Sequence, residues 1–129
     1  MSRQFMVLIA IVGTLGAIAA PETSQDDSTV YRVPVNGEIE LGLAPFIQRA
    51  VTEATETGAV ALILDIDTPG GRVDAAEIIS DALTDSEVPI YSLINRRAYS
   101  AGALIALSTT RIYMRPASVM GAATPVDGT

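Results

Sequence analysis

The sequence Ala-Val-Ala-Leu-Ile-Leu-Asp-Ile occupies residues 59–66 and is followed by Asp-Thr-Pro-Gly-Gly-Arg at residues 67–72. The first part is a nearly unbroken apolar run, which is typical of a strand covered on both faces in a parallel sheet. The second part contains a proline and two adjacent glycines, which predict a turn. We therefore expect a buried strand that ends near residue 66 and a loop at its carboxyl end.

Strand and helix signals alternate on both sides of this stretch. Pro34 favours an edge position for the first strand, Pro45 suits the first turn of a helix, and Asp74 with Glu77 is a plausible helix cap pair. This alternation predicts an α/β fold with a mostly parallel sheet and flanking helices. The expected strands are 30–35, 59–66, 88–94 and 111–114; the expected helices are 45–54, 75–83 and 100–107; the expected irregular segments are 95–97 and 117–129.

The first 20 residues differ from the rest of the chain. Arg3 precedes an apolar run over 5–20 that closes on small residues, which is the pattern of a secretory signal peptide. The alternatives are an uncleaved N-terminal membrane anchor and a buried helix. Residues 21–29 are polar and are expected to form a spacer, so the globular domain is expected over 30–129. As a signal peptide, this segment would export the domain across the cytoplasmic membrane. As an anchor, it would hold the exported domain at that membrane.

Composition excludes most catalytic systems. The 129 residues contain no histidine, cysteine, tryptophan or lysine, since all eight basic residues are arginines. A Ser-His-Asp triad, thiol catalysis and cysteine metal sites are therefore impossible within these residues, and we expect no metal or cofactor. The net charge of −7 argues against a nucleic-acid partner. The remaining chemistry must use hydroxyls, carboxylates, arginines and backbone groups.

Two loops are expected at the same edge of the sheet, because both follow strands: 67–72 and 95–100. Gly70 and Gly71 allow backbone conformations in which successive N–H groups converge on one oxyanion. Ser100 is expected at the start of an apolar helix, beside the N–H of Ala101, and is a candidate nucleophile. The alternatives are an ordinary strand-to-helix turn for the glycines and a helix-capping role for Ser100.

Charged residues near these loops have simpler interpretations. Asp65 and Asp67 are expected to be polar residues at a strand end, because two carboxylates without histidine are too few for a metal site. Arg96 and Arg97 are expected to be solvated loop residues, with binding of a substrate carboxylate as the alternative.

The order of several motifs resembles a known family. They are Val35-Asn36-Gly37-Glu38-Ile39, the segment 64–71, Val88-Pro89-Ile90, Ser100-Ala101-Gly102-Ala103, and Ile112-Tyr113-Met114 continuing to 121–126. In this order they resemble the Clp-protease/crotonase superfamily, and within it the membrane-bound serine proteases of the NfeD family. The resemblance implies a Clp-protease/crotonase-like fold over most of the globular part.

The same resemblance implies a Ser-Lys endopeptidase. Ser100 would be the nucleophile, and Gly70 and Gly71, with Ala101, would form the oxyanion hole. It further implies cleavage of hydrophobic segments of membrane-associated proteins, stomatin-like partners and a homo-oligomer. The family's general base is a lysine that follows the serine, and this sequence contains none. We expect a fragment that is truncated before the base; the alternative is a complete but catalytically silent chain.

Two other function classes remain open from the sequence. A catalytically silent pseudo-protease would hold a peptide in the same cleft without cutting it. A crotonase-like enzyme would use the same oxyanion hole on acyl thioesters, although an export signal argues against a cytosolic thioester substrate.

Overall fold

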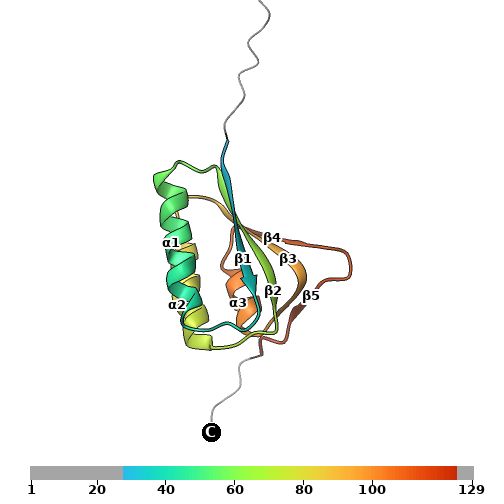
Figure 1. Cartoon of the computed structure of the whole chain (residues 1–129). Coiled ribbons are helices and arrows are strands. Elements are labelled where there is room, and N and C mark those ends of the chain that lie inside the picture. Colours follow the sequence, from blue (N-terminus) through green and yellow to red (C-terminus); the bar gives the residue numbers. More distant parts are fainter. Residues whose placement is uncertain (1–27, 125–129) are drawn as a thin grey trace, which may run out of the picture.

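The computed structural model of this chain describes residues 28–124, which form one layer of helices on one sheet (Figure 1). The predicted signal or anchor segment, most of the predicted spacer and the last five residues lie outside the described residues. The elements are β1 (Val30–Asn36), α1 (Leu43–Glu56), β2 (Ala61–Thr68), α2 (Val73–Thr84), β3 (Ile90–Tyr99), α3 (Ala101–Leu107), β4 (Arg111–Met114) and β5 (Val119–Gly121).

The sheet is parallel throughout, as the alternating pattern predicted. Its order is β1-β2-β3-β4, and β5 pairs with β3. Pro34 lies in β1, which is an edge strand, as predicted. Because parallel neighbours need a crossover connection, each helix returns the chain to the start of the next strand. All the loops that follow the strands therefore meet at one edge of the sheet.

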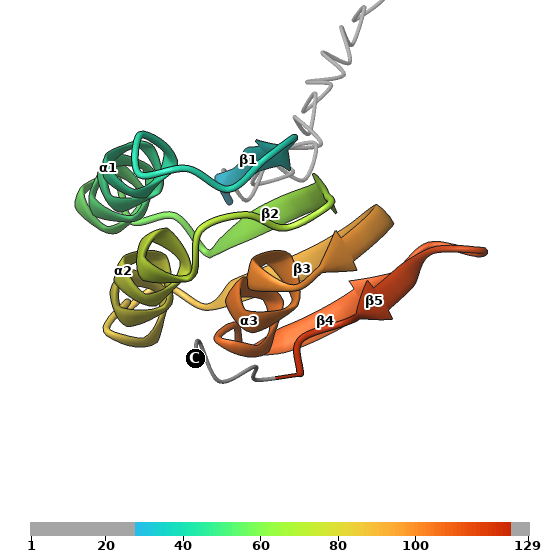
Figure 2. The same cartoon turned by 90° about the horizontal axis from the view of Figure 1, so that it is seen from below.

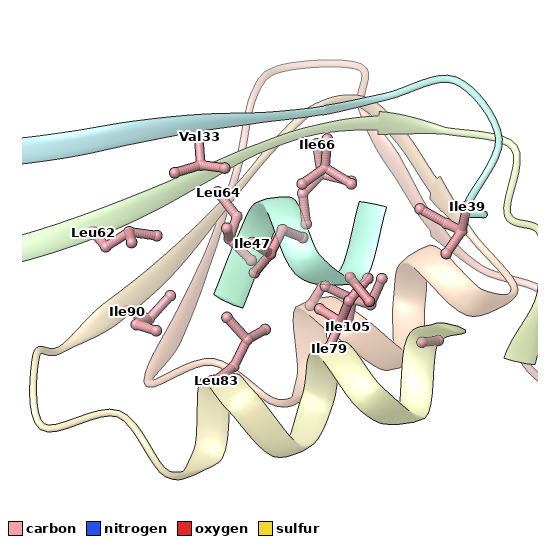
Figure 3. Close-up of a cluster of buried hydrophobic side chains, with 14 of the residues drawn as sticks. Val33, Ile39, Ile47, Leu62, Leu64, Ile66, Ile79, Leu83, Ile90 and Ile105 are labelled. Carbon is pink, nitrogen blue, oxygen red and sulfur yellow. The ribbon is translucent and has the colours of Figure 1, made fainter. Parts of the chain in front are cut away.

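The three helices cover one face of the sheet (Figure 2). The core lies between the two layers, where isoleucines from the helices meet the alternate residues of β2 (Figure 3). Ile47, Ile79 and Ile105, one from each helix, are fully buried, and so are Leu64 and Ile66 of β2. This apolar core fixes the register of β2, and with it the position of the loop that β2 carries.

The two central strands run further toward this edge than predicted. The prediction that β2 ends at Ile66 is wrong, because Asp67 still pairs with Asn36 and Thr68 pairs with Ala98. The prediction of a loop over 95–97 is also wrong, because β3 continues to Tyr99. Between the paired positions Ile66–Ile94 and Thr68–Ala98, β2 has one residue and β3 has three, so β3 carries a bulge that accommodates its polar residues.

Two smaller predictions also fail. The segment 117–129 was expected to be irregular, but Val119–Gly121 forms β5 by pairing with residues 97–99 of β3. Asp74 does not cap α2 with Glu77, because the helix already begins at Val73. The Asp74 carboxylate instead accepts hydrogen bonds from the Arg72 side chain and the Ala75 N–H.

No helix within residues 28–124 is both long enough and apolar enough to cross a lipid bilayer.

Candidate active site

The two loops predicted to be neighbours do meet, at the carboxyl ends of β2 and β3. A Cβ atom placed on Gly70 would lie 2.8 Å from the Cβ of Ser100 and 3.5 Å from its Oγ. It would also lie 2.9 Å from the carbonyl oxygen of Tyr99. Any side chain at position 70 would therefore collide with the serine, and glycine is what permits this close approach.

Ser100 joins β3 to α3 in a conformation that L-residues rarely adopt. Its φ is 50° and its ψ is −120°, and such strained residues persist only where the surrounding structure holds them. Here the Ser100 N–H donates to the carbonyl of Gly121 in β5 at 2.9 Å, and the Ser100 carbonyl accepts from Ala103 N–H at 2.9 Å. The N–H and the carbonyl of Ser100 are thus both held by hydrogen bonds. The turn places the serine side chain at the edge of the sheet where the strands end.

The Ser100 hydroxyl is not used as a helix cap. No side-chain hydrogen bond caps α3, so the capping interpretation is wrong. A serine in a positive-φ turn between a strand and a helix, with its hydroxyl uncommitted among the described residues, is the arrangement that exposes a nucleophile in hydrolases.

The Gly70–Gly71 loop is anchored to the segment that follows β1. Ile39 N–H donates to the Gly70 carbonyl at 2.8 Å, and Arg72 N–H donates to the Ile39 carbonyl at 2.8 Å. Gly71 has a φ of +152°, and a Cβ placed on it would lie 2.3 Å from the Ile39 oxygen. The loop therefore packs backbone against backbone.

The N–H groups of this loop are not equivalent. Gly70 N–H donates to Thr68 Oγ1 at 3.0 Å, so in this structure it shapes the loop and is not free to bind an oxyanion. Gly71 N–H has no acceptor among residues 28–124. Ala101 N–H is in the first turn of α3, where helix geometry provides no acceptor. Of the three N–H groups expected to line an oxyanion site, those of Gly71 and Ala101 therefore have no acceptor among the described residues, whereas that of Gly70 has one.

Ion pairs occupy the sheet face opposite the helices. Asp65, which is buried, pairs with Arg32, and its Oδ1 has no hydrogen-bond partner among the described residues. Asp67 Oδ1 lies 3.3 Å from Arg97 Nε. Arg97 therefore has a partner within the sheet, while Arg96 is exposed. The described residues contain no group of three or more potential metal-ligating side chains.

A surface hollow between α1 and α2 lies at the opposite edge of the sheet, where both helices end. Thr52, Glu56 and Asp85 are among its lining residues. The one serine in this lining, Ser86, donates its hydroxyl to the Val88 carbonyl at 3.0 Å. The hollow contains no uncommitted nucleophile in a strained turn, so it is not the candidate active site.

Sequence reasoning missed three contributors to this site: Thr68, Ile39 and Gly121. Thr68 was treated as part of the turn, although a threonine next to Pro-Gly-Gly is a natural local hydrogen-bonding residue. Ile39 and Gly121 lie in two of the motifs that carry the family resemblance, but their roles here are those of backbone atoms, whose contacts a motif does not specify.

Comparison with known proteins places the chain in a family. The model of the NfeD1b N-terminal domain matches residues 29–129. This chain belongs to the NfeD1b N-terminal domain family. The membrane protein NfeD1b of Bacillus subtilis is 48% identical over 103 residues, which are 80% of this chain and 24% of that protein. The membrane-bound protease PH1510 of Pyrococcus horikoshii is 34% identical over 102 residues, 77% of this chain and 23% of that protein.

Solved structures agree with this assignment. A Pyrococcus horikoshii membrane protease specific for a stomatin homolog superposes with a TM-score of 0.70 at 34% identity, covering 74% of this chain and 49% of that one. ClpP1 of Listeria monocytogenes, with a TM-score of 0.56 and 24% identity, shows the shared fold alone. The predicted resemblance and the Clp-protease-like α/β fold are thus confirmed. The chain spans about a quarter of the length of the curated relatives and about half of the solved ones.

Proposed function

We propose that this NfeD1b N-terminal domain carries the nucleophile and the oxyanion site of a serine endopeptidase. The observation that carries the proposal is the strained turn at Ser100, whose uncommitted hydroxyl lies against the Gly70–Gly71 loop. The similarity to a membrane-bound stomatin-specific protease supports a protease-like function. One of the similar solved structures is a serine-to-alanine mutant of that protease, which supports a serine at the centre of the chemistry.

The proposed reaction is acyl transfer through Ser100. Its Oγ attacks the carbonyl carbon of the scissile peptide bond and passes its proton to a base. The carbonyl oxygen becomes an oxyanion, which accepts hydrogen bonds from the N–H groups of Gly71 and Ala101. The C–N bond then breaks, the amine leaves with the proton from the base, and water hydrolyses the acyl ester to restore the serine.

The base in this proposal is a lysine that is not among the 129 residues. A serine hydroxyl is a weak nucleophile without a base, and arginine stays protonated at any usable pH. A similar solved structure, with a TM-score of 0.73, is a lysine-to-alanine mutant of the same protease in complex with a substrate peptide. The use of a lysine variant for a complex with a substrate peptide supports a Ser-Lys mechanism.

We further propose that the substrate is a hydrophobic segment of a membrane-associated protein, with a stomatin-like protein as the partner. The support is the specificity of the Pyrococcus horikoshii protease for a stomatin homolog and the fact that the relatives are named as membrane proteins. Export or anchoring at the cytoplasmic membrane and assembly as a homo-oligomer belong to the same proposal.

Labelling with a fluorophosphonate tests the proposed nucleophile. In the complete gene product, Ser100 Oγ should form a bond to phosphorus while the P–F bond breaks and fluoride leaves. Ser100→Ala should abolish labelling. Ser108→Ala is the matched control, because Ser108 lies at the other end of the same helix and its hydroxyl only donates to the Leu104 carbonyl. Unchanged labelling of the Ser100→Ala protein would overturn the assignment.

The same experiment separates protease from pseudo-protease. A protein that binds a hydrophobic peptide, remains unlabelled and does not cleave the peptide would be a silent peptide-binding module. Cleavage that disappears with Ser100→Ala and survives Ser108→Ala supports the endopeptidase.

A further inference from the structure

Thr68 contacts both parts of the candidate site, the Gly70–Gly71 loop and the start of α3. It is the last residue of β2, it is fully buried, and it pairs with Ala98 of β3. We propose that Thr68 is a positioning residue, whose hydroxyl sets the Gly70–Gly71 loop and whose methyl group sets the start of α3. The proposal rests on the proposed function, because the two parts that it aligns are the oxyanion donor and the nucleophile.

The hydroxyl group of Thr68 forms hydrogen bonds that hold the Gly70–Gly71 loop in place. Its Oγ1 donates to the Gly37 carbonyl at 2.5 Å and accepts the Gly70 N–H at 3.0 Å. A hydroxyl has a single proton to donate. The Gly37 carbonyl at 2.5 Å is a better acceptor for it than the Gly70 carbonyl at 3.4 Å, which assigns the proton to Gly37. The bond from Gly70 turns that N–H away from the site, while the Gly70 carbonyl is held by Ile39 N–H. The next N–H along the chain, that of Gly71, is the one left without an acceptor.

The methyl group of Thr68 contacts α3, the helix that follows Ser100. Gly102 is the second residue of α3, and a Cβ placed on it would lie 2.2 Å from Thr68 Cγ2. The methyl group thus occupies the space where a side chain would begin, and α3 rests directly on β2 at this point. The next nearest atoms to that Cβ are Thr68 Cβ at 3.7 Å and Ala98 Cβ at 3.9 Å, both ordinary contacts.

These two contacts explain why one side chain can align the site. An attacking Oγ and an oxyanion donor must both lie within hydrogen-bond range of the same carbonyl group, and small displacements of either are costly. Thr68 contacts the Gly70–Gly71 loop through its Oγ1 atom and α3 through its Cγ2 atom. Its position therefore fixes the distance between Ser100 and the Gly71 N–H.

The hydroxyl is tested by comparing Thr68→Val with Thr68→Ser in the complete gene product. Thr68→Val keeps the methyl group and loses the hydroxyl, so we expect kcat for a peptide substrate to fall about 100-fold with little change in KM. Thr68→Ser keeps the hydroxyl and loses only the methyl contact with Gly102, so its kcat should lie between that of Thr68→Val and that of the original protein. Both are measured below the melting temperature of each variant, since a purely structural role would change thermal stability and leave kcat of the folded protein intact.

The methyl contact is tested by a compensation experiment that does not depend on Thr68→Val folding. Gly102→Ala alone should lower both the melting temperature and the rate of fluorophosphonate labelling, because its Cβ meets Thr68 Cγ2. In Thr68→Ser/Gly102→Ala that methyl group is absent, so both quantities should recover toward those of Thr68→Ser. A double variant no better than Gly102→Ala would overturn the proposal.

The outcomes distinguish this proposal from the proposed function. If Ser100→Ala leaves labelling unchanged, the protease assignment fails, and the melting temperatures of the compensation experiment still test the packing. If Ser100→Ala abolishes labelling but Thr68→Val retains the original kcat, the protease assignment stands and Thr68 is not a positioning residue.

Discussion

The carbonyl oxygen of Ile39 lies where a side chain at Gly71 would begin, because a Cβ placed on Gly71 would be only 2.3 Å from it. This contact joins the segment after β1 to the loop after β2. The backbones of the two segments therefore pack directly against each other at the carboxyl ends of the strands.

Gly71→Ala should therefore displace the loop. The positive φ alone costs about 1–3 kcal/mol in the free energy of unfolding, and the collision with Ile39 adds to this. We expect fluorophosphonate labelling of Ser100 to be lost. Gly58→Ala is the control, because Gly58 also has a positive φ but has no atom within 4 Å of its added Cβ. Gly58→Ala should lose stability and keep labelling; equal labelling of the two variants would contradict this account.

Two adjacent isoleucines of α2 give a matched test of the core. Ile79 is fully buried, whereas Ile78 is 41% exposed. Ile79→Ala should lower the free energy of unfolding by about 2–5 kcal/mol, because it leaves a cavity between helix and sheet. Ile78→Ala should cost clearly less, because much of its side chain is already in water. Denaturant unfolding followed by circular dichroism measures both, and similar losses would mean that α2 faces the sheet differently.

Arg32 and Arg72 test how much burial of the acidic partner matters. Both arginines are exposed, but Asp65, the partner of Arg32, is buried, and Asp74, the partner of Arg72, is exposed. Arg32→Met leaves a buried carboxylate without the Nε and Nη2 donors of the guanidinium group, so a loss of about 1–3 kcal/mol is expected. Arg72→Met should lower stability clearly less than Arg32→Met, because both members of its ion pair are in water. Chemical denaturation at pH 7 compares the two, and a larger loss for Arg72→Met would contradict the pairing.

The Arg72–Asp74 pair also predicts a pH effect. The hydrogen bond from the Arg72 side chain lowers the pKa of the Asp74 carboxyl below its ordinary value of 3.8. A lowered pKa in the folded state stabilises the fold above pH 3.8, and this contribution is lost as the pH falls through the folded-state pKa. A carboxyl NMR titration should show the pKa of Asp74 rising in Arg72→Met. No rise would mean that the pair is not formed in solution.

The sequence predicted the parts of the fold that depend on local pattern. The apolar run of β2, the helical stripes of α1 and α2 and the meeting of the two loops all follow from periodicity and from the rule that parallel strands end at one edge. Predictions failed where tertiary pairing overrides local signals. Residues 95–97 are polar, which predicts a loop, yet they remain in β3. Residues 95 and 96 lie in a bulge between paired positions, and Arg97 pairs with Val119 of β5.

The candidate site was predicted only in part for the same reason. The residue types of Ser100, Gly70 and Gly71 indicate that they are candidates for the site. Which of the two glycine N–H groups has an acceptor within the protein depends on the Thr68 hydroxyl. No composition or spacing reveals which way an N–H points, and that orientation required the structure.

The partner of the Ser100 N–H has a consequence for the order in which the site is made. That partner is the carbonyl of Gly121, in a three-residue strand 21 positions further along the chain. During synthesis, the serine and the glycine loop leave the ribosome before the strand that holds the serine in its turn. The proposed nucleophile is therefore present in the growing chain before its strained turn can form, and the candidate site is completed only after β5 has paired with β3.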